Sequence, residues 1–121
     1  MEIHGREIRF RRTVLGNCEI AEICPDKDIN KFNDLISGEY AIAQRAAAAF
    51  MVAMNKGYEM NAKYENPEHV ERPLTMEEVL LLDNDTFNDL FLEALSVFAD
   101  DGRVTVEAEE PKGKNGNGDS E

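Results

Sequence analysis

The 121-residue chain has no tryptophan, only two cysteines and only two histidines. Five residues separate Cys18 from Cys24, which fits neither a Cys-x-x-Cys redox motif nor a paired zinc knuckle. Two positions six apart on one helix face different directions and cannot form a disulfide. We therefore expect two reduced, part-buried thiols. His4 and His69 lie far from each other and from the cysteines in the sequence, so no zinc site is expected.

The chain also lacks a long apolar segment. Residues 1–12 alternate apolar and charged side chains, unlike a signal peptide. No later run reaches the roughly 20 apolar residues that a membrane span needs. We expect a cytosolic protein that makes no contact with a membrane.

Positive charge is scarce, since 13 Lys and Arg face 25 Asp and Glu, for a net charge of −12. Residues 74–99 contain six acidic residues and no Lys or Arg. Such a surface repels nucleic acid and anionic membranes, so neither is an expected partner. It suits solubility or a basic partner.

Motifs that carry catalysis are missing. Residues 83–85 and 26–28 each open like a calcium-binding loop, but Asn88 and Lys31 stand where the loop requires glycine. Both segments are better interpreted as helix caps. The chain has no Gly-rich phosphate loop and no Gly-x-Ser-x-Gly elbow. We expect no metal, no cofactor and no enzymatic activity.

What the chain does contain is an apolar segment at residues 40–54, in which only Gln44 and Arg45 are polar. It predicts a helix, ending near residue 56 or beyond Gly57, that is apolar on nearly every side. The rest of the chain could cover this helix as a core, or one Ala/Met face could be left for a partner helix, and the two alternatives are compatible. The expected partner-binding residues are Ala43, Ala47, Phe50, Met51 and Met54, together with Leu92 from a later helix.

The first twelve residues predict a β-hairpin. His4-Gly5 supplies the tight turn, and Ile8 and Phe10, two positions apart, share one face of a strand. A lone hairpin is marginally stable in water, so it should pack on helices or pair with another chain.

Helical patterns follow the hairpin. Thr13 to Cys24 predicts a first helix with Val14, Leu15, Cys18 and Ala21 facing inward and Ile20 as a further candidate. A short helix follows around residues 29–36. Residues 37–39 break the chain before the apolar helix, and residues 60–72 lack periodicity and predict a loop.

The clearest local signal is a capping box. Thr75-Met-Glu-Glu78 allows the threonine hydroxyl and the glutamate side chain to bond each other's backbone N–H. Residues 83–85 then cap a last helix, on which Phe87 to Phe98 form an apolar stripe at helical spacing.

These elements predict a mainly α (α+β) fold, an N-terminal β-hairpin packed on about five helices. We expect a single globular domain over residues 1–108, with the hairpin in 1–12 and helices in 13–100. Arg103 to Ala108 has strand-forming residues and predicts a short edge strand. Residues 109–121 are polar and Gly-containing, so we expect a disordered acidic tail.

Charge is also arranged for self-association. If the arginines of the hairpin and the acidic residues of the last helix lie on opposite sides of the fold, copies could associate head to tail. The residues of this expected contact are Arg6, Arg9, Arg11, Asp83, Asp85 and Asp89. A solvated acidic surface with a few covering arginines is the alternative.

Two segments carry a resemblance to a known family. One is the opening Glu2-Ile-His-Gly-Arg-Glu-Ile-Arg-Phe10, and the other is Leu74-Thr-Met-Glu-Glu-Val-Leu80 followed by an acidic amphipathic helix. With the helices between them, they resemble the tail assembly chaperones of long-tailed, siphovirus-type bacteriophages, by layout over most of residues 1–100. The resemblance implies a small protein without catalysis that binds the hydrophobic, helical tape measure protein and keeps it soluble during tail tube assembly.

The family also implies location and further partners. Such a protein works in the host cell cytoplasm and is not expected in the mature virion. Some members self-associate, and many are also made as a longer frameshifted product, so a homo-oligomer and a frameshifted longer form are further expected partners. The alternative function is a small acidic regulator or inhibitor that masks a basic protein surface or mimics nucleic acid.

Overall fold

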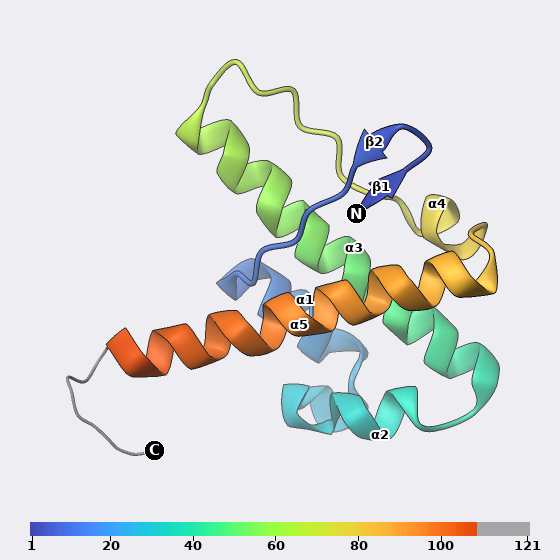
Figure 1. Cartoon of the computed structure of the whole chain (residues 1–121). Coiled ribbons are helices and arrows are strands. Elements are labelled where there is room, and N and C mark those ends of the chain that lie inside the picture. The colour runs from blue at the N-terminus through green and yellow to red at the C-terminus, as the bar shows by residue number, and fades with distance from the viewer. Residues whose placement is uncertain (109–121) are drawn as a thin grey trace.

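The computed structural model describes the backbone of residues 1–108 and the side-chain surroundings of residues 1–100. Within that range the fold is mainly helical with one small hairpin, as the sequence predicts (Figure 1). The strands are β1 (Glu2–Ile3) and β2 (Arg6–Glu7), and the helices are α1 (Val14–Ile23), α2 (Phe32–Ile36), α3 (Tyr40–Glu65), α4 (Met76–Leu80) and α5 (Asn84–Ala108), with two 3-10 turns, Pro25–Lys27 and Ile29–Lys31, before α2.

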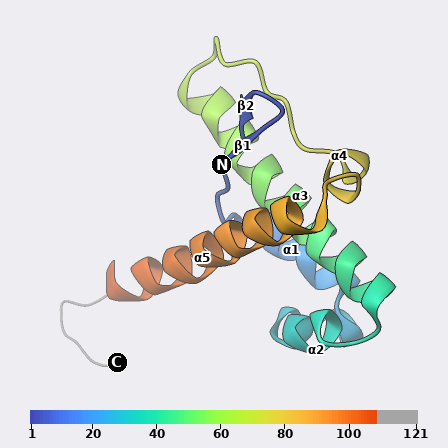
Figure 2. The ribbon, with the colours of Figure 1, turned by 45° about the vertical axis from the view of Figure 1, so that its right-hand side comes forward.

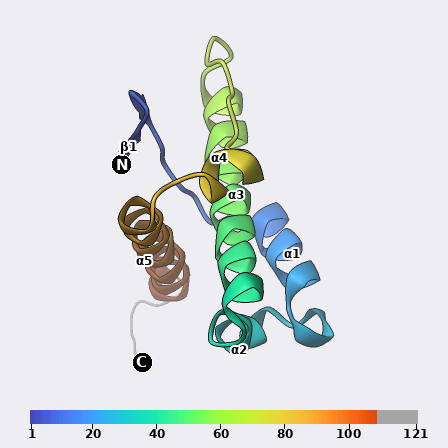
Figure 3. The same cartoon turned by 90° about the vertical axis from the view of Figure 1, so that its right-hand side faces the viewer.

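Helix α3 lies at the centre of the fold. Figure 3 shows α5 on one side of it and α1 on the other, and α2 and α4 also pack against it. Because neighbours cover it on several sides, its middle turns are buried around most of their circumference. The all-round apolar composition of residues 46–54 is therefore satisfied within one copy of the chain.

The hairpin is present but shorter than predicted. Each strand has two residues, and His4 and Gly5 at the turn have φ of 51° and 76°, the positive values that a two-residue hairpin requires. The chain then continues without sheet pairing, and Ile8 and Phe10 are both buried in the core. Arg11 donates its backbone N–H to the carbonyl of Met54 at 3.0 Å, so this extended segment pairs with α3.

The buried face of α1 agrees only in part with the predicted one, since Ile20 is buried and Ala21 is half-buried. Thr13 caps the helix, its hydroxyl accepting from the Gly16 N–H at 2.9 Å. Val14, Leu15 and Cys18 are exposed, however, and the helix faces the core with Gly16 and Ile20. A Cβ at Gly16 would lie 3.1 Å from the Thr13 hydroxyl oxygen, a tight contact, and 3.4 Å from the Ala53 carbonyl oxygen, an ordinary one, so this position packs against both the N-cap and α3.

Helix α3 takes the longer of the two predicted courses, beyond Gly57, and reaches Glu65. The loop predicted to start at residue 60 therefore starts at residue 66 and continues to residue 75. Its N-terminal end follows the predicted break, with Glu39 as the N-cap. Near its middle, the ring of Phe50 stacks on Phe32 at 4.9 Å and meets Phe91 and Phe98 edge-on at 5.8 and 5.3 Å. This aromatic cluster joins α2, α3 and α5.

The last two helices begin as predicted. Thr75 and Glu78 form the capping box of α4, and the predicted apolar stripe of α5 faces the core. Figures 1 and 2 show that the N-terminal half of α5 crosses α3 and that the helix continues past it.

The edge strand predicted at residues 103–108 is wrong, because α5 runs to Ala108. One glycine, at a cost of about 1 kcal/mol, does not end a helix by itself. The predicted disordered tail, residues 109–121, lies outside the described residues.

Candidate partner-binding site

A groove of about 440 Å³ opens between the N-terminal turns of α3, the end of α4 and the N-terminal turns of α5. Its lining combines apolar and uncharged polar side chains with one basic residue. The α3 side contributes Tyr40, Ala41, Gln44 and Arg45, and the other side contributes Leu80, Asn84, Phe87 and Asn88.

The groove has an apolar part and a polar part. The Phe87 ring is buried and Leu80 is partly exposed, so together they offer a hydrophobic surface. Gln44, Asn84 and Asn88 offer carboxamides, each with two donors and an acceptor. This mixture suits a partner that presents apolar side chains with polar groups at their border.

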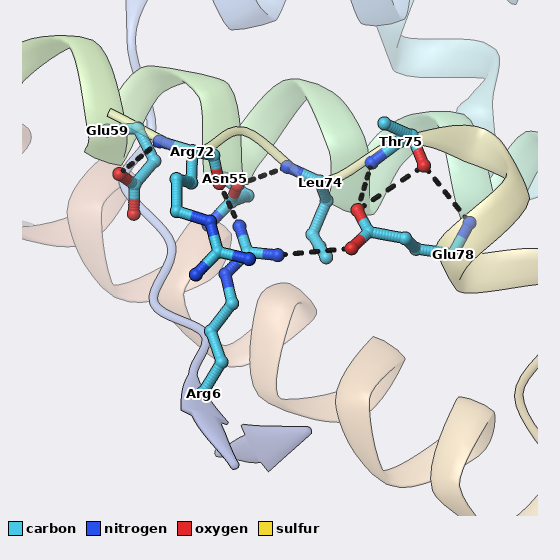
Figure 4. A network of polar contacts seen from close by, with 7 residues as sticks. All are labelled: Arg6, Asn55, Glu59, Arg72, Leu74, Thr75 and Glu78. Atoms are coloured by element: carbon cyan, nitrogen blue, oxygen red, sulfur yellow. Dashed lines mark hydrogen bonds and ion pairs between the residues drawn. The ribbon is translucent and has the colours of Figure 1, made fainter. Parts of the chain in front are cut away.

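Caps at the starts of α4 and α5 position the wall formed by these helices. The Thr75 hydroxyl accepts from the Glu78 N–H at 3.1 Å, and Glu78 accepts from the Thr75 N–H at 2.9 Å (Figure 4). Asp83 caps α5 by accepting from the Thr86 N–H at 2.8 Å, and this bond lowers the pKa of the Asp83 carboxyl. The chain between the caps therefore turns sharply, which leaves Leu81 exposed.

Buried polar side chains on α3 hold the loop between α3 and α4 in place. The sequence patterns did not single these side chains out. Asn55 donates to the Arg9 carbonyl at 2.9 Å. Asn55 also accepts from the Leu74 N–H at 2.7 Å, and Glu59 accepts from the Arg72 N–H at 3.0 Å (Figure 4). The same oxygen of Glu59, Oε1, also lies 2.8 Å from Nε2 of the His69 ring. The available signal was the four-residue spacing of Asn55 and Glu59, which places both side chains on one face of the helix.

Three apolar side chains are strongly exposed at or near the groove. Tyr40 is 70% exposed, Leu81 is 78% exposed and Leu92 is 61% exposed. Leu92 follows Asn88 by four positions, so both lie on one face of α5. Single exposed apolar residues are ordinary, but here they adjoin a concave surface.

Acidic residues flank the groove. Glu39 is next to Tyr40, Asp83 and Asp85 are on either side of Asn84, and Asp89 follows Asn88, and all four are exposed. Arg45 is the basic residue of the lining. The surroundings of the groove are therefore negative overall.

The predicted Ala/Met face of α3 is not an exposed docking surface. Ala47, Phe50, Met51 and Met54 are buried in the core, and Ala43 is half-buried. They are covered because α3 packs against helices on several sides, which a helical pattern alone does not reveal. Among the predicted partner-binding residues, Leu92 is the one that the structure leaves exposed.

One of the arginines predicted for self-association lies beside the acidic segment and not opposite it. Arg6 pairs with Glu78 at 3.2 Å and donates to the Arg72 carbonyl, so it lies beside α4, within the acidic segment (Figure 4). Arg11 pairs with Glu65 of α3 at 3.1 Å. Arg9 is exposed, as are Asp83, Asp85 and Asp89. Two of the three arginines are therefore engaged within the chain.

The remaining reactive groups are separated. Cys18 is exposed and Cys24 is buried, its thiol donating to the Ile20 carbonyl at 3.2 Å. Within residues 1–100, no group of three or more His, Cys, Asp and Glu is placed to hold a metal ion. None of the helices, over their described lengths, is long and apolar enough to span a membrane.

No protein-family model matches the chain, and neither a curated protein nor a solved structure is significantly similar to it.

Proposed function

We propose that this protein is a tail assembly chaperone of the siphovirus type, which binds the hydrophobic helical tape measure protein and keeps it soluble during tail tube assembly. The observation that carries the proposal is the open groove, with exposed apolar side chains beside it, on a strongly acidic protein. A chaperone of this kind needs apolar surface for its client and enough charge to keep the complex in solution. The resemblance of residues 1–100 to the family supports the same function.

The proposal includes the setting of this activity. The protein acts in the host cell cytoplasm without catalysis and does not remain in the mature virion. Homo-oligomers and a frameshifted longer form are further proposed partners. Because Arg6 and Arg11 are paired within the chain, Arg9 is the hairpin arginine that self-association would use.

Co-expression tests this function directly. The tape measure protein encoded nearest to this gene should become soluble when this chain is produced with it and should co-purify with it. An unrelated acidic protein of similar size is the control. An unchanged soluble fraction of the tape measure protein would contradict the proposal.

A second candidate function is a small acidic regulator that masks a basic protein surface or mimics nucleic acid. It is favoured by the exposed carboxylates of residues 74–99, a segment without Lys or Arg. Binding of that kind should be lost at about 0.5 M salt, because exposed charges are then screened within a few ångströms. Apolar binding to a tape measure helix should persist at that salt concentration.

A further inference from the structure

We propose that the groove between α3, α4 and α5 binds an amphipathic helix whose apolar face is bordered by Lys and Arg. This inference rests on the proposed function, which supplies a helical and hydrophobic client, and it names the surface and the kind of client segment. Shape, lining and charge each support it.

The α5 side of the groove is long enough to accommodate several turns of a client helix. Phe87, a buried residue of the lining, lies in the sequence between the exposed residues Leu81 and Leu92. Asn84 and Leu92 are eight residues apart on α5, roughly 12 Å at 1.5 Å per residue. A client helix presents apolar side chains over the same length at positions i, i+3 or i+4, and i+7.

The polar lining is suited to the border of such a helix. Gln44, Asn84 and Asn88 carry no charge and can each donate and accept hydrogen bonds. They can therefore meet the polar side chains of a client without requiring one particular partner. This tolerance fits a long client with many similar segments.

The charge around the groove determines which charged residues should border the apolar face of the client helix. Four exposed carboxylates adjoin the lining in the sequence, at residues 39, 83, 85 and 89, against the guanidinium of Arg45. A client bordered by Lys and Arg would gain from these carboxylates, whereas one bordered by Asp and Glu would be repelled. The partner is thus a basic amphipathic helix and not an apolar helix of any charge.

Synthetic peptides of about 18 residues test the inference, since that length forms roughly five helical turns. One peptide has leucines on one face bordered by lysines, a second has glutamates in place of the lysines, and a third keeps the lysines but replaces the leucines with serines. Titration of the whole protein, followed by fluorescence anisotropy, should show binding of the first peptide. The second should bind at least about tenfold more weakly because of like-charge repulsion, and the third should not bind.

Charge-reversal variants then locate the site. The double variant Asp85→Lys, Asp89→Lys should bind the lysine-bordered peptide about tenfold more weakly and the glutamate-bordered peptide more tightly. The reason is that the charge beside the groove changes from negative to positive. The matched control, Glu68→Lys with Glu71→Lys, makes the same change in net charge in the loop after α3 and should alter neither affinity strongly. All four positions are exposed, and circular dichroism would verify that the variants keep their helices.

The outcomes separate this inference from the function on which it rests. Equal binding of the lysine and glutamate peptides, or equal losses in both double variants, would overturn the inference. A change in oligomeric state on reversal at the groove would also overturn it, because the occupant would then be a second copy. If the tape measure protein is still solubilised in any of these cases, the proposed function stands and the client binds elsewhere.

Discussion

At the scale of single residues, Gly57 marks a close approach between α3 and the segment that follows the hairpin. A Cβ built there would lie 2.8 Å from the Arg11 carbonyl oxygen and 2.9 Å from a methyl carbon of Thr13. The first of these atoms belongs to the backbone, so it cannot move aside as the end of a side chain can. The glycine therefore allows the segment after the hairpin to lie directly on the helix.

Gly57→Ala should destabilise the protein although alanine is the better helix former. We expect a loss of about 1–3 kcal/mol in the free energy of unfolding, the usual cost of overpacking, partly offset by the gain in helix propensity. Urea unfolding followed by circular dichroism measures the change. Gly38→Ala is the control, because its nearest neighbour would be an ordinary 3.5 Å away. A Gly57→Ala protein as stable as the wild type would contradict the close contact.

The two cysteines should differ in reactivity. Burial, and secondarily the nearby Asp28 carboxylate, raise the pKa of the Cys24 thiol, while Cys18 is exposed on α1. At pH 8 a thiol reagent should modify one cysteine rapidly in the folded protein and both in denaturant, and Cys18→Ser should abolish the rapid phase. Two equally rapid cysteines would contradict the burial of Cys24.

The raised pKa of the Cys24 thiol also makes the stability of the protein depend on pH. Because the folded-state pKa of Cys24 lies above its unfolded value, the folded protein holds this proton more tightly. The contribution of Cys24 to the free energy of unfolding is therefore constant at neutral pH. It declines as the pH rises above the ordinary pKa of a thiol and toward the raised pKa of the folded state. Cys24→Ala should show a smaller alkaline loss of stability than Cys18→Ala.

At the scale of elements, local signals in the sequence predicted the caps and the apolar stripe of α5, because these depend on residues close together in the chain. The Thr75–Glu78 box and the His4-Gly5 turn are of this kind. Which faces are covered depends on tertiary packing, so it was predicted less well. Val14 was expected to face the core and is 80% exposed. Met51 was expected at a partner surface and is fully buried.

The groove could not be predicted for the same reason. Its lining comes from three helices, and Tyr40 and Phe87 are 47 positions apart in the sequence. Only Leu92 gave a direct signal, because it projects from an otherwise regular stripe. The length of α5 was missed because Val104 and Val106 favour strands locally, a preference that the continuing helix overrides.

The loop at residues 66–75 should depend on Asn55. Asn55→Ala removes the acceptor of the Leu74 N–H and the donor to the Arg9 carbonyl, leaving groups without partners at a cost of about 1–3 kcal/mol. Hydrogen exchange should show faster exchange at the Leu74 amide. Asn61→Ala, which removes a bond to the Gly57 carbonyl within α3, is the control and should leave that amide protected. An unchanged rate at Leu74 in the Asn55 variant would show that other contacts hold the loop.

At the scale of the whole molecule, charge is unbalanced. The repulsion from the net charge of −12 is offset by ion pairs such as Arg11–Glu65 and Lys27–Glu22, in which both side chains are exposed, and exposed pairs each contribute little to stability. Repulsion among the carboxylates therefore opposes the compact state.

Added salt should consequently stabilise the protein at pH 7. The Debye length falls from about 30 Å at 10 mM to about 8 Å at 0.15 M, which screens the repulsion. We expect the midpoint of thermal unfolding to rise by roughly 4 °C, equivalent to about 1 kcal/mol. The Glu68→Lys, Glu71→Lys variant, with less net charge, should show a smaller rise. A fall in the midpoint with salt would mean that attractive pairs outweigh the repulsion.

The position of α3 between α1 and α5 has a consequence for fragments of the protein. A cut in the exposed chain at residues 66–68 would leave the hairpin and α1–α3 in one piece and α4 and α5 in the other. Phe50 would then lose its contacts with the rings of Phe91 and Phe98, so the first piece alone would leave part of its hydrophobic core exposed to water. The two halves should recover a native fold only by complementation. Since the groove takes one wall from each half, peptide binding would report their reassembly.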